Sequence, residues 1–540
     1  MIYSWGMKPK DIIPVSQNMN TISGEGIKIL GAVFLRVAGT DDSGRVVEAA
    51  IMAYVTESTT RFYLSKHAMR QLGVIGPDFP SVKASQAQEF ASATASCGCP
   101  KHTKPPPRPK KLPFAPVPEN IDRMKEWILD RYASSTFNKC PHQRLPMIDS
   151  KPLKVHMDPD AKPVAVYTAA TVPLHWREEV KAQLDEDVAL GVLEKVPAGE
   201  PTVWQARMHV VPKHDGTPRR TVDMRALNKN CKRESQHVVP PFKQARSVPS
   251  HTWKTVTDAW NGYHSVPLAE EDRHLTTFIT EWGRYRYRVA PQGYVASGDA
   301  YNARYDEIIA DIPRKTKCVD DAMIWDQDED LEEHCWRTLD YLTLVGENGV
   351  ILTPKKLQFC QKIATFAGFV VGETTVKPLP KYLEAIKNFQ RPTTISEARA
   401  WFGLVNQVSR YGKLTEIMFP FRELLSPKSK FKWTDEMESA FEHSKLAIIS
   451  AIEEGVEIFE PNRTTLLSPD FSKKGIGYFL YQKYCACPSP TTTTCCKSGW
   501  KIVLAGSRFL RKSEQNYWPV EGEALAVKWS LEDTRFFTWG

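Results

Sequence analysis

The stretch of sequence that decides the fold is Lys315-Thr-Lys-Cys-Val-Asp-Asp-Ala-Met-Ile-Trp325. Short β-prone segments flank its two adjacent carboxylates, Asp320 and Asp321, which favours a β-hairpin with both acids at the tip. A third acid, Asp258, ends another β-prone run. Carboxylates that converge from separate strands repel one another, so they stay ionised together only when a cation lies between them. The pattern therefore predicts a metal site in the middle of the chain.

Divalent Mg²⁺ or Mn²⁺ is the natural occupant of such a site, because both ions prefer oxygen ligands. Two of these ions about 4 Å apart can activate a 3′-hydroxyl and stabilise a leaving pyrophosphate. Taken alone, an Asp-Asp dipeptide is more often a plain turn. The chemical interpretation therefore depends on the motifs that surround it.

Six motifs, one of which contains the two adjacent acids, follow one another in the middle of the chain. They are Val211-Pro-Lys-His-Asp-Gly-Thr-Pro-Arg-Arg-Thr-Val-Asp-Met-Arg-Ala-Leu-Asn-Lys229, Val256-Thr-Asp-Ala-Trp-Asn-Gly-Tyr-His264, Ala290-Pro-Gln-Gly293, Cys318-Val-Asp-Asp321, Leu352-Thr-Pro-Lys-Lys-Leu357 and Phe366-Ala-Gly-Phe369. Together they resemble the reverse transcriptase of a gypsy-type LTR retrotransposon, over residues 150–450. The resemblance implies an α+β multidomain protein with a right-hand polymerase of fingers, ferredoxin-like palm and thumb.

The resemblance implies a catalytic role for four residues. Asp258, Asp320 and Asp321 would be the triad that binds two Mg²⁺ or Mn²⁺ ions, and Lys356 could protonate pyrophosphate. The implied reaction adds deoxynucleotides, from their triphosphates, to the 3′-end of a primer on an RNA or DNA template. The primer would be gripped by four consecutive residues, Phe366, Ala367, Gly368 and Phe369.

A second implied group would bind the incoming nucleotide. Lys213 and Arg219 would reach its triphosphate from a fingers hairpin, because fixed positive charge binds phosphate oxygens. Tyr263 would lie beneath the sugar and exclude a 2′-hydroxyl, while Gln292 and Gly293 would shape the pocket for template and nucleotide. From the residues alone, a solvated basic hairpin and a buried core tyrosine remain the alternative interpretations.

One residue departs from the family pattern. Cys318 stands where the family usually has an aromatic residue, most often Tyr. The change removes packing near the primer end, so we expect altered activity or fidelity. It also keeps an alternative open, in which the chain is a catalytically inactive remnant that binds nucleic acid or serves as a structural subunit.

Two C-terminal motifs, Ser468-Pro-Asp-Phe-Ser-Lys-Lys-Gly-Ile-Gly477 and Val520-Glu-Gly-Glu-Ala-Leu-Ala526, resemble the start of an RNase H domain. Asp470 and Glu523 match two of the four metal-binding acids of that domain, with Glu521 as the alternative to Glu523. The elements expected to carry the other two acids do not follow in this sequence. We therefore expect a truncated domain without RNase H activity.

Four cysteines lie between two predicted strands of the same C-terminal region. Cys485, Cys487, Cys495 and Cys496 form the pattern C-x-C-x7-C-C, which differs from the usual pair of C-x2-C motifs. A surface loop with reduced thiols is the favoured interpretation, and a tetrahedral Zn²⁺ site is the alternative.

The N-terminal region has a resemblance of its own. Residues 12–55 resemble the second half of a retropepsin, and Phe62–Gly73 resembles its closing helix. Asp42-Ser43-Gly44 has the letters of the catalytic protease motif, but polar residues flank it where that motif needs apolar strands. Asp-Ser-Gly is also good turn chemistry. We therefore predict a hairpin turn here and no protease activity.

Composition agrees with a nucleic-acid partner but does not require one. The 540 residues include 71 Lys and Arg against 63 Asp and Glu, a formal charge of +8. Eleven cysteines without a secretory signal indicate an intracellular protein, in the cytoplasm or the nucleus, and no apolar run reaches the ~18 residues of a membrane span. The predicted order is a β-rich retropepsin-like half (12–77), an extended, proline-rich linker (78–120), fingers and palm (121–393), thumb or connection (394–455) and the truncated RNase H-like α/β domain (456–540). Within the thumb or connection, residues 394–449 are predicted to be helical and are rich in aromatic residues.

Overall fold

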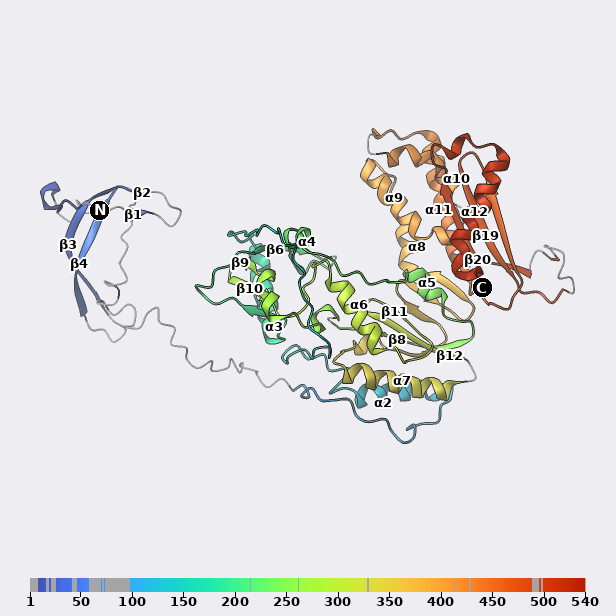
Figure 1. Ribbon diagram of the computed structural model, residues 1–540, viewed down its shortest axis with the longest axis horizontal. Helices are drawn as coiled ribbons and strands as arrows, with labels where there is room; N and C mark the ends of the chain where they lie inside the picture. Colours follow the sequence, from blue (N-terminus) through green and yellow to red (C-terminus); the bar gives the residue numbers. More distant parts are fainter. Residues whose placement is uncertain are drawn as a thin grey trace. The chain divides into compact units, whose positions relative to one another are not determined.

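The computed structural model describes most of the chain (Figure 1). The described residues are 8–15, 19–20, 26–40, 46–57, 69, 72, 98–213, 215–260, 262–327, 330–412, 414–426, 429–487, 495–496 and 499–539. They fall into two compact units, Met1–Ser96 and Cys97–Gly540.

The first unit is built on one long antiparallel hairpin. Strand β3 (Ile29–Thr40) pairs with β4 (Val46–Thr56), and β1 (Met19–Asn20) pairs with β2 (Gly26–Ile27). Ala32, Val33, Ile51 and Val55 are buried along the hairpin. The β-rich character predicted for this region is confirmed. The Asp42-Ser43-Gly44 turn and most of the predicted helix at 62–73 lie outside the described residues.

The second unit begins with a five-stranded sheet that corresponds to the predicted fingers. Its order is β5 (Leu193–Lys195), β10 (Gly283–Tyr287), β9 (Phe278–Thr280), β6 (Ala206–Pro212) and β7 (Pro218–Val222). Helix α3 (Arg177–Ala189) packs beside it with Val180 and Leu184 fully buried. Each of these side chains stabilises the packing by about 1.5–3 kcal/mol. Short helices α4 (Arg225–Lys229) and α5 (Pro241–Arg246) lead to the next sheet.

The central sheet has the order of a ferredoxin-like fold. Its strands are β11 (Lys315–Cys318), β12 (Asp321–Gln327), β8 (Thr252–Asp258) and β13 (Gln358–Gln361), all antiparallel. Helix α6 (Ser297–Ile308) follows β8, and α7 (Leu331–Glu347) follows β12, which gives the β-α-β-β-α-β order along the chain. The palm predicted from the sequence resemblance is therefore present.

Hydrogen bonds between buried hydroxyls connect this sheet to its helices. Tyr305 of α6 and Tyr341 of α7 lie 2.7 Å apart through their hydroxyl oxygens, and Tyr341 reaches the Thr257 hydroxyl of β8 at 2.7 Å. All three residues are at most 2% exposed. Because a buried hydroxyl is costly to leave unpaired, these bonds fix the two helices against the strand that carries Asp258.

A third sheet joins the palm to the segments that follow. Its order is β14 (Ala364–Phe366), β15 (Phe369–Val371), β16 (Thr375–Pro378) and β17 (Val456–Glu457). The partners β16 and β17 are separated in sequence by the helices α8 (Pro380–Lys387), α9 (Ile395–Gln407), α10 (Thr415–Met418) and α11 (Asp435–Glu454). Ile458 donates its backbone N–H to Thr374 at 2.7 Å, and Lys501 pairs with Glu457 at 2.8 Å.

The predicted helical, aromatic-rich segment is confirmed between these two strands. Thr394 and Thr434 cap helices α9 and α11 by accepting a hydrogen bond from the backbone N–H three residues on. The helices pack around a cluster of aromatic side chains, which includes Trp401, Phe402, Phe421 and Phe441.

The C-terminal region forms a small α/β layer, as predicted. Its sheet has the order β18 (Thr465–Phe471), β19 (Gly475–Lys483) and β20 (Trp500–Phe509), and helix α12 (Pro519–Thr538) packs against it. Arg410 and Tyr478 both donate to Asp533 of α12, which connects the layer to the preceding helices. None of the helices in the described part of the chain is both long and apolar enough to cross a membrane.

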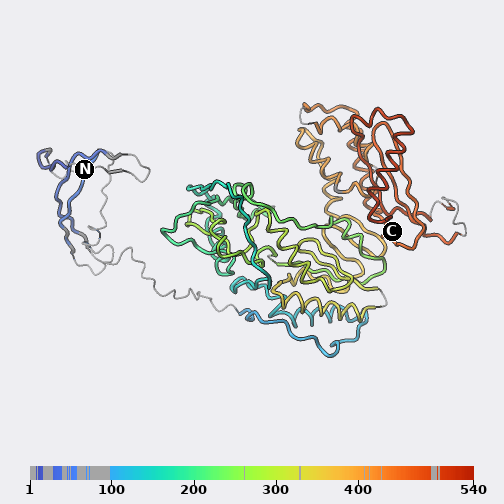
Figure 2. Tube along the Cα trace, viewed as in Figure 1, coloured from blue at the N-terminus to red at the C-terminus, as the bar shows by residue number. Residues whose placement is uncertain are grey.

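The predicted linker is extended where it is described, but it is not a free spacer. Helix α2 (Ile121–Arg131) follows it, and Figure 2 traces the linker along the side of α2 and α7. Arg108 pairs with Asp340 at 2.9 Å and lies 4.6 Å above the ring of Trp336. Leu112 and Phe114 also pack against the main core. Proline density keeps the segment extended, while its interspersed apolar and basic side chains find partners on the helices.

A buried charge network lies under the palm sheet. Asp326 of β12 is 0% exposed and accepts from Arg314 at 2.9 Å, from Arg337 at 2.9 Å and from His334 at 3.0 Å. Burial alone would raise the pKa of Asp326, but the hydrogen bonds from His334 and Arg337 outweigh it and hold the pKa below its ordinary value.

We expect Asp326→Ala to destabilise the protein by about 3–5 kcal/mol, because it leaves the largely buried Arg337 guanidinium and the buried His334 ring without the carboxylate that they bind. Urea denaturation followed by tryptophan fluorescence measures this loss. Glu333→Ala is the matched control. It removes an exposed carboxylate from the same Arg337, at 3.1 Å, and should cost less than about 1 kcal/mol. Equal losses in the two variants would contradict this account of the network.

A second prediction concerns acid stability of the C-terminal layer. Glu514 accepts from Arg508 at 2.8 and 3.0 Å and from the Arg511 N–H at 2.7 Å, and the Arg508 guanidinium lowers the pKa of Glu514 to about 2. A lowered carboxyl pKa stabilises the folded state above the unfolded pKa, near 4.5, and this contribution is lost as the pH falls toward about 2.

At pH 7, Glu514→Gln should therefore lower the stability of this layer by about 1–3 kcal/mol. The difference in melting temperature from the unaltered chain should narrow as the pH falls from 5 toward 3. Thermal melts at several pH values, with the exposed Glu523→Gln as control, measure the difference. A difference in melting temperature that stays constant with pH would show that the charge of Glu514 does not contribute to stability.

Candidate active site

Three carboxylates meet where strands β8, β11 and β12 come together. Asp321 is the direct cross-strand partner of Asp258, and Asp320 precedes it in the turn between β11 and β12. The backbone carbonyl of Asp320 accepts from Ala259 N–H at 2.8 Å, and that of Asp258 accepts from Thr353 N–H at 2.8 Å. The hairpin with acids at its tip, predicted from the sequence, is confirmed.

The turn that carries Asp320 is strained. Cys318 and Asp321 are paired, so only Val319 and Asp320 form the loop, and Val319 has a φ of +55°. A β-branched residue rarely adopts positive φ, and holding it there costs on the order of 1–3 kcal/mol. Such strain persists only where the surroundings fix the backbone. Here the pairing of both flanking strands and the Ala259 hydrogen bond hold Asp320 beside Asp258 and Asp321.

The surroundings of Asp320 and Asp321 raise the pKa of both carboxyls. Burial, with the charges of Asp258 and Asp321 added, raises the pKa of Asp320 to about 6. Burial and Asp258 also raise the pKa of Asp321, although the Ala367 N–H opposes this. Oδ1 of Asp320 is buried and has no hydrogen-bond partner among the described residues. Three oxygen ligands, one of them unsatisfied, fit a hard divalent cation.

Lys356 brings positive charge to the same cluster. Its Nζ lies 2.7 Å from Oδ2 of Asp258, while its side chain remains 62% exposed. Lys356 is in the short 3₁₀ turn Pro354–Lys356, just before β13. The sequence-predicted Lys356 therefore contacts the triad directly, and its exposed ammonium can reach a ligand bound there.

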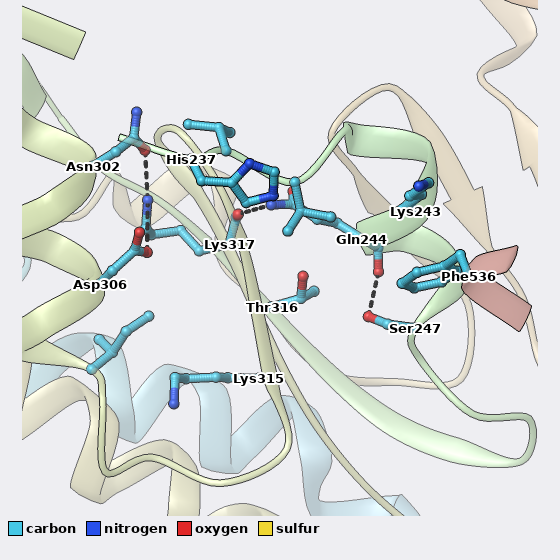
Figure 3. Close-up of a pocket in the computed structure, with 13 residues that line it drawn as sticks. His237, Lys243, Gln244, Ser247, Asn302, Asp306, Lys315, Thr316, Lys317 and Phe536 are labelled. Carbon is cyan, nitrogen blue, oxygen red and sulfur yellow. Dashed lines mark hydrogen bonds and ion pairs between the residues drawn. The ribbon is translucent and has the colours of Figure 1, made fainter. Parts of the chain in front are cut away.

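Side chains of helices α5 and α6 bind to strand β11 (Figure 3). Nζ of Lys317 lies 2.7 Å from Oδ1 of Asn302 and 3.2 Å from Asp306, both on α6. Gln244 of α5 donates to the backbone carbonyl of Lys317. Lys317 also lowers the pKa of Asp320 through its charge. These residues line the pocket of Figure 3, and their contacts fix the strand that leads into the turn with Asp320.

Tyr263 lies beside the carboxylates. A Cβ at position 262 would collide with Oδ1 of Asp320 and with the ring of Tyr301, so only glycine fits there. The Tyr263 ring meets Tyr301 edge-on, with ring centroids 5.5 Å apart. Burial and the charge of Asp320 raise the pKa of Tyr263. The half-buried Tyr263 is therefore neither a core residue nor a free surface residue, and its ring borders the carboxylate cluster.

The basic pair predicted for the triphosphate lies on the fingers hairpin. Lys213 and Arg219 are both exposed, and Arg219 is the cross-strand partner of Val211. Neither side chain forms an ion pair with another described residue. The neighbouring Arg220, which points to the opposite face, pairs with Asp187 at 2.7 Å. Alternation along β7 thus leaves one arginine neutralised and the other available for a ligand.

The Gln292–Gly293 turn is clamped by a residue that sequence reasoning missed. Nδ2 of Asn228 donates to the Gly293 carbonyl at 2.9 Å, and Oδ1 of Asn228 accepts from the Val295 N–H at 2.9 Å. Gly293 has a φ of +89°, and the Gln292 side chain is exposed. Asn228 lies inside the first quoted motif, but nothing in the sequence indicated this long-range contact.

The predicted primer grip is a tight turn between β14 and β15. Phe366 and Phe369 are paired, and the two central residues, Ala367 and Gly368, have φ of +48° and +91°. Such values match a type I′ turn. The backbone N–H of Ala367 donates to the carboxylate of Asp321. Cys318 packs with Ala367 and Phe369 against the buried cluster beneath them, so the departure from the family pattern lies at this junction.

In the C-terminal layer, the two predicted acids lie on adjoining elements. Asp470 is on β18 and Glu523 is on the first turns of α12, and both are exposed. A Cβ at Gly522 would collide with the ring of Phe471, so α12 begins directly against the end of β18. Glu521, the alternative to Glu523, instead caps its helix by accepting from the Trp518 N–H at 2.9 Å.

Comparison with known proteins agrees with this arrangement. Residues 211–371 match the family model of reverse transcriptase (RNA-dependent DNA polymerase), and residues 433–540 match that of the RNase H-like domain found in reverse transcriptase. The Transposon Tf2-3 and Tf2-7 polyproteins of Schizosaccharomyces pombe are 26% and 25% identical to this chain, over 61% of its length. The chain spans 24% of the length of these relatives.

Solved structures show the same fold at lower sequence identity. The foamy viral protease-reverse transcriptase in complex with RNA/DNA hybrid has a TM-score of 0.66 and 19% identity, covering 98% of this chain and 65% of that one. A form of it in complex with double-stranded DNA has the same score and identity, covering 98% and 85%. Residues 211–371 therefore belong to the reverse transcriptase family and residues 433–540 to its RNase H-like companion, as in the Pol polyprotein of a gypsy-type retrotransposon.

Proposed function

We propose that this chain adds deoxynucleotides to the 3′-end of a primer, directed by an RNA or DNA template. Asp258, Asp320 and Asp321 would hold two Mg²⁺ or Mn²⁺ ions, and these would supply positive charge to the 3′-hydroxyl and the pyrophosphate. The family match of residues 211–371 and the similarity to the Tf2 polyproteins support this reaction class. The nucleic acids bound by the foamy viral neighbours support the choice of partner.

The observation that carries the proposal is the unsatisfied carboxylate cluster. Asp320 is half-buried beside two other acids, its buried Oδ1 lacks a partner among the described residues, and its pKa is raised to about 6. A structural role would favour neutral or hydrogen-bonded side chains at this position, because buried like charges destabilise the fold. A function that needs a bound cation explains why three acids are held together.

The remaining residues bind and orient the substrates in this proposal. Lys213 and Arg219 bind the triphosphate of the incoming nucleotide, Tyr263 borders its sugar, and Lys356 holds a proton at Nζ near the leaving group. Gln292 and Gly293 contact the template and nucleotide, and the 366–369 turn supports the primer end. Binding along the nucleic-acid backbone is electrostatic and weakens with salt.

For the C-terminal region we propose a supporting role. Asp470 and Glu523 are the two acids that match the RNase H pattern, and we assign no hydrolysis to them. The ion pair between Arg410 and Asp533 instead connects α12 to the helices that follow the palm. We assign no protease activity to the N-terminal hairpin.

Replacing both adjacent acids tests the proposed site. Asp320→Asn/Asp321→Asn should reduce primer extension by about a thousandfold or more, the scale on which essential catalytic groups act. Extension of a labelled primer on an RNA template, with Mg²⁺ or Mn²⁺, measures this. The melting temperature should stay equal or rise, because the substitution removes repulsion between half-buried acids, so misfolding cannot explain the loss.

Asp311→Asn, which changes an exposed acid between α6 and β11, is the control and should extend primers normally. Normal extension by the double variant would overturn the site assignment. If the unaltered chain binds primer and template in a salt-sensitive manner but does not extend, it is the inactive remnant. Cys318→Tyr then shows whether that residue is responsible.

Tyr263 provides a separate test of substrate selection. Removing its ring in Tyr263→Ala should lower the preference for deoxynucleotides over ribonucleotides by about tenfold or more, because a steric barrier to the 2′-hydroxyl is lost. The measured quantity is the ratio of kcat/KM for the two substrates. Tyr263→Phe keeps the ring and should keep the ratio. An unchanged ratio in Tyr263→Ala would assign the selection to another residue.

A further inference from the structure

The connection between β19 and β20 brings four cysteine side chains together. The sulfur atoms of Cys485, Cys487, Cys495 and Cys496 all lie within 4.8 Å of one another. The sulfurs of Cys485 and Cys495 lie 3.3 Å apart, and those of Cys487 and Cys496 lie 3.7 Å apart. Disulfide sulfurs lie about 2.05 Å apart, so neither distance is that of a covalent bond. Chance placement in a surface loop does not explain four convergent thiols.

The distances suit a tetrahedral metal site. With a Zn–S bond of about 2.3 Å, sulfur ligands at the corners of a tetrahedron lie about 3.8 Å apart. The observed pairs lie close to this value, and the centre of the four sulfurs is the position that a single ion would occupy. Thiolates are soft ligands that select zinc over Mg²⁺ or Mn²⁺, so this cluster is chemically distinct from the carboxylate site of the palm.

The backbone around the cluster is shaped to admit it. A Cβ at Gly499 would lie 2.5 Å from Sγ of Cys485 and 2.6 Å from Sγ of Cys496, so the sulfurs occupy the space of the missing side chain. Tyr484 N–H donates to the Gly499 carbonyl at 2.7 Å and closes the base of the connection. Nζ of Lys483 reaches the backbone carbonyl of Cys487 at 2.8 Å.

Nearby positive charge suits a site with excess thiolate charge. Four thiolates around one Zn²⁺ leave a net charge of −2. Besides Lys483, Arg463 and Lys501 lie over the ring of Tyr484, at 4.2 and 5.0 Å, next to Cys485 in sequence. Arg463 and Lys501 also pair with Glu460 and Glu457, so they offset only part of the charge of the complex.

We propose that Cys485, Cys487, Cys495 and Cys496 bind one Zn²⁺ ion in a closed, structural site. Each thiol releases its proton to solvent as its sulfur bonds to the metal, and no oxidation takes place. With four protein ligands the ion has no open position for a substrate, so its role is to fix the connection between β19 and β20. Closing a long connection in this way removes conformations from the unfolded chain and stabilises the hairpin.

The test is the metal content of the full chain, purified under reducing conditions without chelator. We expect elemental mass spectrometry to find about one zinc per chain. This zinc should be lost in Cys485→Ser/Cys487→Ser. The control Cys231→Ser changes a half-buried thiol outside the cluster and should keep the zinc. Exchange for Co²⁺ should give the thiolate charge-transfer bands and strong visible absorption of a tetrahedral cobalt–sulfur site.

Several results would overturn the proposal. They are a reduced chain that holds no zinc when zinc is supplied, zinc that survives in the double variant, and iron in place of zinc. A mass lower by the hydrogens of two disulfides, in protein kept under reducing conditions, would assign the four cysteines to covalent pairs instead. None of these readouts depends on primer extension, so the proposal and the polymerase function stand or fall separately.

Discussion

Repulsion between the carboxylates of Asp258, Asp320 and Asp321 is the constraint on which the palm depends. The direct pairing of Asp258 with Asp321, and the turn that presents Asp320, hold charges together that would separate in a relaxed chain. Contacts in the surrounding structure offset this electrostatic repulsion. Hydroxyls of Tyr305, Tyr341 and Thr257 fix the strands and helices from below, and the strained Val319 and Ala367 backbones close the site from two sides.

The sequence predicted parts of the palm and of the fingers because their determinants are local. The hairpin around Asp320 and Asp321 in the palm and the hairpin with Lys213 in the fingers both follow from short-range patterns. The ferredoxin-like order of the strands came from the family resemblance, because pairing between distant strands has no local signature. The roles of individual site residues stay predictions, although the structure brings the triad, Lys356 and Tyr263 together.

What sequence reasoning missed are contacts made across long separations. Asn228 clamps the Gly293 turn, Lys317 is buried against Asn302, and Tyr301 packs on Tyr263. Each is an ordinary polar or aromatic residue whose importance depends on its neighbours in space. The contacts of the linker were missed for the same reason. Proline density predicts an extended backbone, but it does not predict the surface against which Arg108 and Phe114 pack. Gly262 alone offered a hint, because a glycine between larger residues often marks a close approach.

The pairing of β16 with β17 has a mechanical consequence. Helices α8 to α11 leave the third sheet at one strand and return to it at the next, so both ends of this helical excursion are anchored beside the turn at 366–369. A movement of these helices must therefore strain that sheet, because both of their ends are attached to it. Strand β18 follows β17 after a short segment, and Lys501 forms an ion pair with Glu457. The third sheet therefore also sets the spacing between the palm and the C-terminal layer. A nucleic acid that contacts both the palm and the C-terminal layer would therefore contact them at one fixed separation.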